Sequence, residues 1–314
     1  MKKWSNYTGF VFVLLLMVAC KGNSSAGQET LFSGVMSIAV DQTLAPLAEE
    51  EIAVFESRYQ YAGILPEYTN EVEAINLLLK DSVRFVIATR PLSGEETESF
   101  HSRKFFPRSI KIATDGIALI VHRQNADSIV NLDMLQQIFS GKVTDWKELP
   151  SRSASGEIQV VFDHPNSSTV RYVIDSICRG EPLSGRCRAV GTNQRVIDYV
   201  ARTPGALGVI GVNWISEDQD SLCKDFRKDI QVMRVSRSRQ PSCQNSYQPY
   251  QYYLYTGQYP LRRDIYILLN DPKGVLPTGL TSFITGAQGQ RIILKAGLLP
   301  ATMPVNIVDI RSEL

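Results

Sequence analysis

Short apolar runs alternate with segments of helical periodicity along most of the chain. In the helical segments apolar residues recur every three or four positions, whereas the short runs are rich in β-branched residues, which are typical of strands. The strands predicted in this way cover residues 34–40, 64–68, 83–88, 116–121, 158–162 and 207–210. Helices follow the predicted caps Thr43, Thr69 or Asn70, Asn131 and Thr192 and the polar turn that ends at residue 169, with a last helix over 280–296. Strands that alternate with helices indicate an α/β fold in which mostly parallel sheets are flanked by helices.

Small polar residues lie where the predicted strands give way to helices. Thr43, Thr69 and the run Ser167-Ser168-Thr169 each follow an apolar strand and precede a helix. In open α/β sheets this edge is where ligands bind, and the free N–H groups of a helix N-terminus suit an anion. Helix capping alone explains any one of these positions. Three of them in one chain favour an anion site.

The N-terminal segment has the pattern of an export signal. Lys2 and Lys3 precede an apolar run over residues 10–19, which is too short to span a bilayer but suits a signal peptide. The stretch Leu16–Cys20 resembles a bacterial lipoprotein cleavage box. We therefore expect a signal peptide over residues 1–19, a lipidated Cys20 and a tether over residues 20–32, so that the exported protein is periplasmic or on the cell surface, held to a membrane by its lipid. The alternative is an ordinary secretory signal with an incidental cysteine.

Composition narrows the classes of partner. The 314 residues are 44% hydrophobic and 21% charged, which suits a globular protein of about two domains. A net charge of +1 gives no basic surplus for nucleic acid. No nucleotide motif and no Cys/His cluster with zinc spacing occurs in the sequence, so we expect neither a cofactor nor a metal.

Four cysteines remain once Cys20 is set aside. An even number of cysteines in an exported chain favours disulfides, and four cysteines allow three pairings. We prefer the pairing that closes the shortest loops, Cys178 with Cys187 and Cys223 with Cys243.

An enzyme is the less favoured interpretation. The neighbours Asp163, His164 and Ser167 suggest a hydrolase triad, but residues of one turn rarely form that relay and no G-x-S-x-G elbow is present. We therefore assign no catalytic residue and keep hydrolysis as a remote alternative.

Several stretches resemble the phosphate-binding proteins of phosphate ABC transporters, the PstS-type periplasmic solute-binding proteins. They are Ile38–Leu47, Val86–Leu92, Asp115–Val121, Ile138–Trp146, Asn166–Thr169 and Gly205–Gly211, and they extend along nearly the whole mature chain. The resemblance implies a two-lobed periplasmic-binding-protein fold of type II with two hinge crossovers. Lobe 1 would comprise residues 33–116 and 256–314, and lobe 2 residues 117–255.

The same resemblance implies capture of inorganic phosphate, or a similar oxyanion, in the cleft between the lobes. Such a protein would deliver its ligand to an ABC permease in the inner membrane, and we expect it to be a monomer. An oxyanion sensor or a surface adhesin with the same fold is the alternative, because each of these roles needs a cleft that closes on its ligand.

Family roles carry over position by position. The threonine and apolar residue that donate hydrogen bonds to phosphate match Thr43 and Leu44, and the serine at the second helix start matches Thr69. The family's Ser-Gly-Thr turn matches Ser167-Ser168-Thr169, with Ser168 in place of glycine.

Two charged positions differ from the family. Arg90 stands where the family has an aspartate that accepts the ligand's proton, and Asp163 stands near the place of its arginine. We predict that Arg90 pairs with the anion and that Asp163 accepts the proton of hydrogen phosphate, which would exclude fully ionised sulfate. A salt bridge between these two residues is the alternative, and Arg171 is a further candidate for the positive partner.

Overall fold

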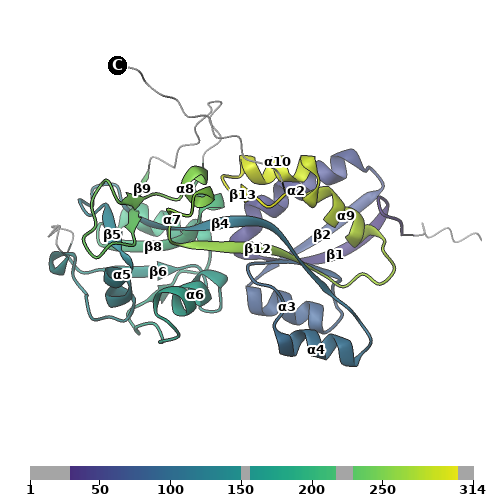
Figure 1. The fold of residues 1–314 in the computed structure, drawn as a ribbon, viewed down its shortest axis with the longest axis horizontal. Helices are drawn as coiled ribbons and strands as arrows, with labels where there is room; N and C mark the ends of the chain where they lie inside the picture. The colour runs from purple at the N-terminus through teal and green to yellow at the C-terminus, as the bar shows by residue number, and fades with distance from the viewer. Residues whose placement is uncertain (1–28, 150–155, 217–228, 303–314) are drawn as a thin grey trace, which may run out of the picture.

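The computed structural model describes residues 29–149, 156–216 and 229–302, which form two lobes (Figure 1). The expected signal peptide and the lipidated Cys20 lie outside the described residues. Within the described part of the chain, none of the helices has the length and apolar character needed to cross a membrane.

The strands form one continuous path through both lobes. Their order is β2-β1-β3-β12-β4-β8-β6-β7, and β13 and β9 also pair with β4. Pairs β1–β2, β1–β3, β6–β7 and β6–β8 are parallel, whereas β4 and β12 are antiparallel to their neighbours. The strands are β1 (Gly34–Asp41), β2 (Ala62–Thr69), β3 (Phe85–Ala88), β4 (Arg108–His122), β6 (Gln159–Phe162), β7 (Arg188–Ala189), β8 (Ala206–Gly211), β9 (Ile230–Val232), β12 (Arg262–Leu269) and β13 (Leu299–Pro300), with a separate small sheet of β5 (Ile129–Asn131), β10 (Arg234–Ser236) and β11 (Ser246–Tyr247).

Strand β4 connects the lobes. It pairs with β12 up to Gly116 and with β8 from Ile117 onward, so one strand belongs to both lobes (Figure 1). The lobe boundary that we expect at residue 116 coincides with this change of partner. The boundary itself stays a prediction, because it concerns which residues move together.

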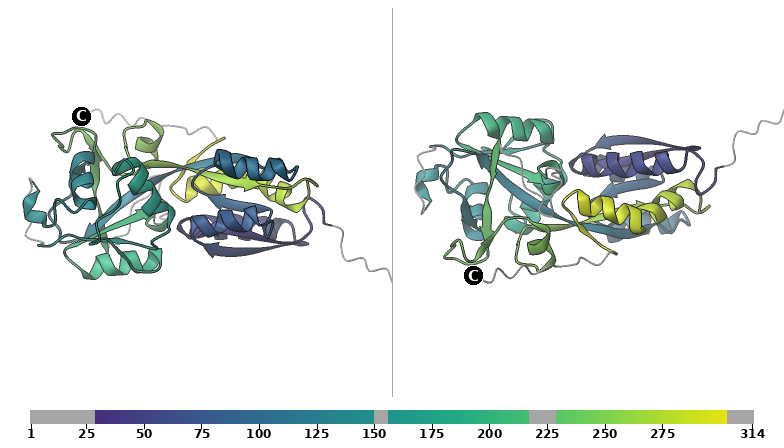
Figure 2. Two further views of the ribbon diagram at one scale, coloured as in Figure 1. Left: turned by 90° about the horizontal axis from the view of Figure 1, so that it is seen from below. Right: turned by 90° about the horizontal axis from the view of Figure 1, so that it is seen from above.

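In lobe 1, helices cover both faces of the sheet. Side chains of one face of β1 pack with α2, α9 and α10, and those of the other face pack with α3 and α4. These helices are α2 (Ala45–Arg58), α3 (Glu71–Leu79), α4 (Gly94–Ser102), α9 (Leu276–Thr285) and α10 (Ala287–Lys295). Figure 1 shows the strands of this lobe between the two groups of helices, and the two views of Figure 2 show the molecule from below and from above.

Lobe 2 repeats this three-layer arrangement. One face of its sheet packs against α5 and α6, and the opposite face packs against α7 and the short helix η4. The helical segments of this lobe are α5 (Leu132–Phe139), η2 (Trp146–Glu148), α6 (Ser168–Tyr172) continued by the π-helical η3 (Val173–Ile177), α7 (Asn193–Arg202), η4 (Val212–Trp214) and α8 (Gln251–Tyr255). The predicted two-lobed α/β fold, with helices flanking the sheet in each lobe, is confirmed. The sheet is mixed, because β4 and β12 run antiparallel to their neighbours.

Two local predictions are wrong. The helix expected over 280–296 is two helices, because the chain is extended at Gly286, with ψ of 174°, between α9 and α10. Thr43 does not cap α2. It lies in the short helix η1 (Gln42–Leu44), which Asp41 caps by accepting a hydrogen bond from the Thr43 N–H, at 3.0 Å.

The predicted disulfide between Cys178 and Cys187 is also wrong, because both thiols are free. Cys178 is buried in the core of lobe 2, and the Cys187 thiol points to the carbonyl oxygen of Phe139, at 3.9 Å. Burial, with the nearby Cys178, raises the pKa of Cys187 to about 11, so this thiol is protonated at neutral pH. Cys243 is likewise free, and its expected partner Cys223 lies outside the described residues.

Candidate ligand-binding site between the lobes

Two buried hydroxyl groups meet where the lobes face each other. Thr43 follows β1 of lobe 1, Ser168 begins α6 of lobe 2, and their hydroxyl oxygens are 3.0 Å apart. The Thr43 carbonyl is fixed from η4, since Asn213 Nδ2 and Trp214 Nε1 donate to it at 3.1 and 2.9 Å. The backbone of Thr43 is therefore held against η4.

Arg263 on β12 joins these two hydroxyl groups. Its Nη1 donates to Ser168 Oγ at 2.8 Å and its Nη2 donates to Thr43 Oγ1 at 3.2 Å. The guanidinium also pairs with Asp115 of β4, with Nε and Nη2 lying 2.9 and 2.8 Å from Oδ2. Burial raises the pKa of Asp115, although the adjacent guanidinium opposes the shift. One arginine on a connecting strand thus contacts both lobes.

A glycine leaves room for this buried pair. A Cβ atom added at Gly211 would lie 3.0 Å from Asp115 Oδ2 and 3.1 Å from Arg263 Nη2, and closer still, at 2.7 Å, to Asn213 Oδ1. A side chain here would displace at least one of these polar groups.

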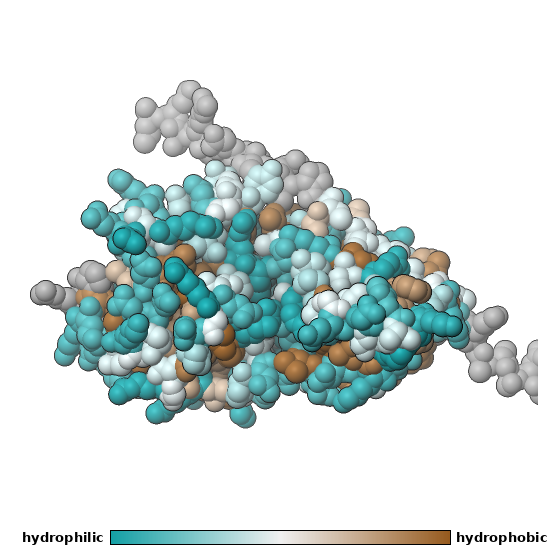
Figure 3. All heavy atoms as spheres, turned by 60° about the horizontal axis from the view of Figure 1, so that its bottom comes forward, coloured by the Kyte–Doolittle hydropathy of each residue, from teal (hydrophilic) through white to brown (hydrophobic). Residues whose placement is uncertain are grey.

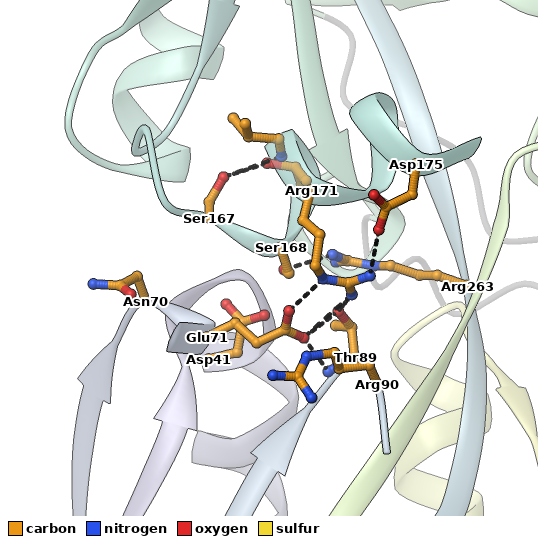
Figure 4. A network of polar contacts seen from close by, with 12 residues as sticks. Asp41, Asn70, Glu71, Thr89, Arg90, Ser167, Ser168, Arg171, Asp175 and Arg263 are labelled. Atoms are coloured by element: carbon orange, nitrogen blue, oxygen red, sulfur yellow. Dashed lines mark hydrogen bonds and ion pairs between the residues drawn. The ribbon is translucent and has the colours of Figure 1, made fainter. Parts of the chain in front are cut away.

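A second arginine spans the lobes beside the first contact (Figure 4). Arg171 of α6 donates through Nε to Glu71 Oε2 at 2.6 Å and through Nη2 to Thr89 Oγ1 at 3.0 Å. Thr89 in turn donates to Glu71 Oε1 from its backbone N–H and its hydroxyl group, at 2.9 and 2.6 Å. Burial opposes ionisation of Glu71, but the charge and hydrogen bonds of Arg171, together with those from Thr89, lower its pKa.

The Ser167-Ser168-Thr169 turn lies at this contact. Ser167 caps α6 by accepting from the Val170 N–H, and its hydroxyl oxygen is 2.8 Å from Thr169 Oγ1. Thr169 donates to Asp163 Oδ1 at 2.8 Å, and all of these polar side chains are buried. Asp163 is thereby placed under the turn, in contact with Thr169.

Lobe 1 places the other predicted residues nearby. Leu44 is fully buried in the core behind the site. Thr69 ends β2, opposite Asp41 in register, and the side chain that caps α3 belongs to Asn70. Figure 4 shows Asn70 at the side of the network, away from Arg171.

Arg90 engages its own lobe. Its Nη1 and Nη2 donate to the two carboxylate oxygens of Glu96, at 2.8 and 2.7 Å. Glu96 also completes the capping box of α4 with Ser93. The structure therefore does not bring Arg90 and Asp163 together, and the ligand roles predicted for them stay predictions. Arg171, the further candidate, is the arginine that crosses between the lobes.

Sequence analysis missed four charged residues of the site: Asp41, Glu71, Asp115 and Arg263. Three of them carry a signal that could have found them, which is a charged residue in or at the end of an apolar strand. Arg263 lies at one of the alternate buried positions of β12, as do Ile265 and Ile267. Asp115 lies within the apolar stretch of β4. A charged residue in such a position is buried and must be paired.

The arrangement provides hydroxyl and guanidinium donors from both lobes at one point. Hydroxyl groups supply directional hydrogen bonds, and a guanidinium matches two oxygen atoms of an oxyanion. Among the described residues no group of three or more His, Cys, Asp or Glu side chains could hold a metal ion. Most of the face shown in Figure 3 is polar, and its apolar surface forms separate patches.

Comparisons with known proteins bear on the fold and the family of the chain. The phosphate-binding protein PstS of Staphylococcus aureus (strain USA300) is 24% identical over 250 residues, which are 79% of this chain and 76% of that protein. A putative phosphate ABC transporter substrate-binding protein with bound phosphate, from Clostridium perfringens, superposes with a TM-score of 0.71 at 20% identity, covering 85% of this chain and 100% of the other. An ABC-type phosphate transport receptor from Vibrio cholerae gives a TM-score of 0.64 at 17% identity, covering 86% of this chain and 100% of the other. These two likenesses show the fold. The sequence profile of the PBP superfamily domain matches residues 23–286, most of the chain, and the protein therefore belongs to the PBP superfamily.

Proposed function

We propose that the protein captures inorganic phosphate between its lobes and presents it to an ABC transporter. The observation that carries this proposal is the meeting of Thr43, Ser168 and Arg263 at one buried point. Two hydroxyl groups and one guanidinium offer an oxyanion donors from both lobes, so a bound ligand would hold the lobes together. The phosphate-binding relatives support phosphate as the ligand.

Ligand entry requires the lobes to separate. The hydroxyl oxygens of Thr43 and Ser168 are in hydrogen-bonding contact, which leaves no room for a phosphate group between them. Arg171 and Glu71 form a second contact across the same junction, at 2.6 Å. We infer that the lobes open to admit phosphate and close again around it, with the hydrogen bonds of the ligand in place of these direct contacts.

The relative affinities for different oxyanions test whether phosphate is the ligand. Isothermal titration calorimetry of the mature chain with phosphate, arsenate, sulfate and molybdate in one buffer would rank them. We expect phosphate and arsenate to bind at least tenfold more tightly than sulfate, because Asp163, in its predicted role, would accept the proton that hydrogen phosphate carries and sulfate lacks. Tighter binding of sulfate or molybdate would refute phosphate as the ligand.

Lipid anchoring through Cys20 belongs to the same proposal. The described chain begins on lobe 1, where Phe32 stacks on Tyr59 with ring centroids 4.4 Å apart and Glu29 pairs with Arg84. The preceding tether would therefore join the membrane to lobe 1. Replacing Cys20→Ser should move the protein from the membrane fraction to the soluble fraction, and an unchanged membrane fraction would refute the anchor. We further propose that the exported protein is a monomer, which light scattering can measure directly.

A further inference from the structure

A carboxylate oxygen at the junction of the lobes has no partner. Asp41 ends β1 and is 0% exposed. Its Oδ1 accepts from the Thr43 N–H, at 3.0 Å, but its Oδ2 is buried without a hydrogen-bond partner among the residues that the structure describes. An ionised oxygen left in this way is costly, because it has lost water and gained no donor.

The charged groups around Asp41 do not fully neutralise the negative charge of its ionised form. Glu71 faces it from the start of α3 and Arg263 faces it from β12, with the Ser168 hydroxyl group between the lobes. Arg263 is already paired with Asp115 on β4, and Glu71 is paired with Arg171 of α6. Burial, followed by the charge of Glu71, raises the pKa of Asp41 to about 7, against the opposing effects of Arg263 and Ser168.

A bound oxyanion would add negative charge beside Asp41. It would contact Thr43, Ser168 and Arg263, the groups beside Asp41, and would draw on the positive charge of the same guanidinium. Its own negative charge would then face an ionised Asp41 in a buried site. A protonated Asp41 removes this repulsion and turns Oδ2 from an acceptor into a donor toward the ligand.

We propose that Asp41 is a ligand-binding residue that takes up one proton from solvent when an oxyanion binds. The proton resides on Oδ2 and is donated in a hydrogen bond to a ligand oxygen. This inference rests on the proposed function, since it needs an oxyanion between the lobes. It gives Asp41 the opposite role to that predicted for Asp163, which was to accept a proton of the ligand.

The number of protons taken up per phosphate tests this inference. Calorimetric titration between about pH 8 and pH 9, in buffers of different ionisation enthalpy, measures proton uptake while the ligand stays a dianion. We expect an uptake approaching one proton, and an affinity for phosphate that falls by up to about tenfold per pH unit. Asp41→Asn should bind phosphate with an uptake near zero and with little dependence on pH.

A matched control is available in lobe 1. Glu51 on α2 is also a buried carboxyl group with unpartnered oxygens among the described residues, but it lies in the helix layer, away from the ligand contacts. Glu51→Gln should therefore keep the proton uptake of the wild type. Infrared difference spectra on adding phosphate should show the C=O stretch of a protonated carboxyl group, which Asp41→Asn removes and Glu51→Gln retains.

The outcomes are distinct. Phosphate binding by the wild type without proton uptake would overturn this inference alone, and this measurement needs no variant. Unchanged uptake in Asp41→Asn would also overturn it. A wild type that binds no phosphate at any pH would overturn the proposed function and this inference with it.

Discussion

Replacing Arg263→Met should destabilise the protein strongly, because it leaves the buried carboxylate of Asp115 without its charged partner. Arg263 and Asp115 have side-chain exposures of 2% and 0%, and the guanidinium makes two contacts to Asp115 Oδ2 at 2.8 and 2.9 Å. Removing one partner of a buried ion pair costs about 3–5 kcal/mol, since the other charge stays buried and unpaired. Asp115 would keep only hydrogen bonds from backbone N–H groups, such as that of Val212 at 3.2 Å.

A double-mutant cycle separates this charge effect from lost packing. In Arg263→Met with Asp115→Asn no unpaired charge remains, so we expect most of the loss to be recovered and a coupling energy of about 2–4 kcal/mol. The cost of the single variant should also shrink at acid pH, where Asp115 becomes protonated. Arg262→Met is the control, because Arg262 is exposed on the same strand and should cost less than about 1 kcal/mol.

Urea unfolding followed by tryptophan fluorescence measures these free energies of unfolding. A loss of stability below about 1 kcal/mol in Arg263→Met would refute the claim that the buried pair of Arg263 and Asp115 stabilises β4 and β12. Failure of Asp115→Asn to recover stability would show that the loss comes from packing instead of charge.

Three further predictions concern other parts of the molecule. Glu51→Gln should raise the free energy of unfolding at pH 7 by up to about 3 kcal/mol, because burial raises the pKa of Glu51 to about 9 in the folded chain, whereas in the unfolded chain this carboxyl group ionises above about pH 4.5. Urea unfolding should show that the stability of the wild type falls as the pH rises between these two values, and an equal slope in the variant would contradict the assignment. Glu71→Gln should increase phosphate affinity on the order of tenfold in calorimetry, because it removes a like charge beside the ligand; weaker binding would instead mean that Glu71 holds the arginine in place for the ligand. Gly211→Ala should lower both stability and phosphate affinity, because its Cβ would crowd Asp115 and Arg263; wild-type values in urea unfolding and calorimetry would show that these side chains can move aside.

The sequence predicts several local elements of this fold. β1, β2 and β6 lie close to the apolar runs that predicted them, and Asn131 and Thr192 cap their helices as expected. Short-range patterns determine these features, because periodicity and capping depend on residues a few positions apart.

The site depends on contacts that no local pattern encodes. Thr43 and Ser168 are 125 positions apart, and Arg263 lies 220 positions from Thr43. The family resemblance implied ligand contacts for the hydroxyl residues. The positive partner was predicted to be Arg90, which stands in place of the family's aspartate and whose local partner Glu96 is six residues away. Pairing of Arg263 with Asp115 follows from the antiparallel register of β4 and β12, which only the folded sheet determines.

The central claim, which we propose in place of the role predicted for Arg90, is that phosphate is held between the lobes by the Ser168 hydroxyl group and its neighbours. Calorimetric titration of phosphate into the wild type, Ser168→Ala and Arg90→Met at one pH tests it most directly. A hydrogen bond to a charged ligand contributes about 1.5–3 kcal/mol, so Ser168→Ala should weaken binding by about 10-fold to 150-fold. Arg90→Met should stay within about threefold of the wild type, because Arg90 is occupied by Glu96. A larger loss in Arg90→Met than in Ser168→Ala would contradict the account.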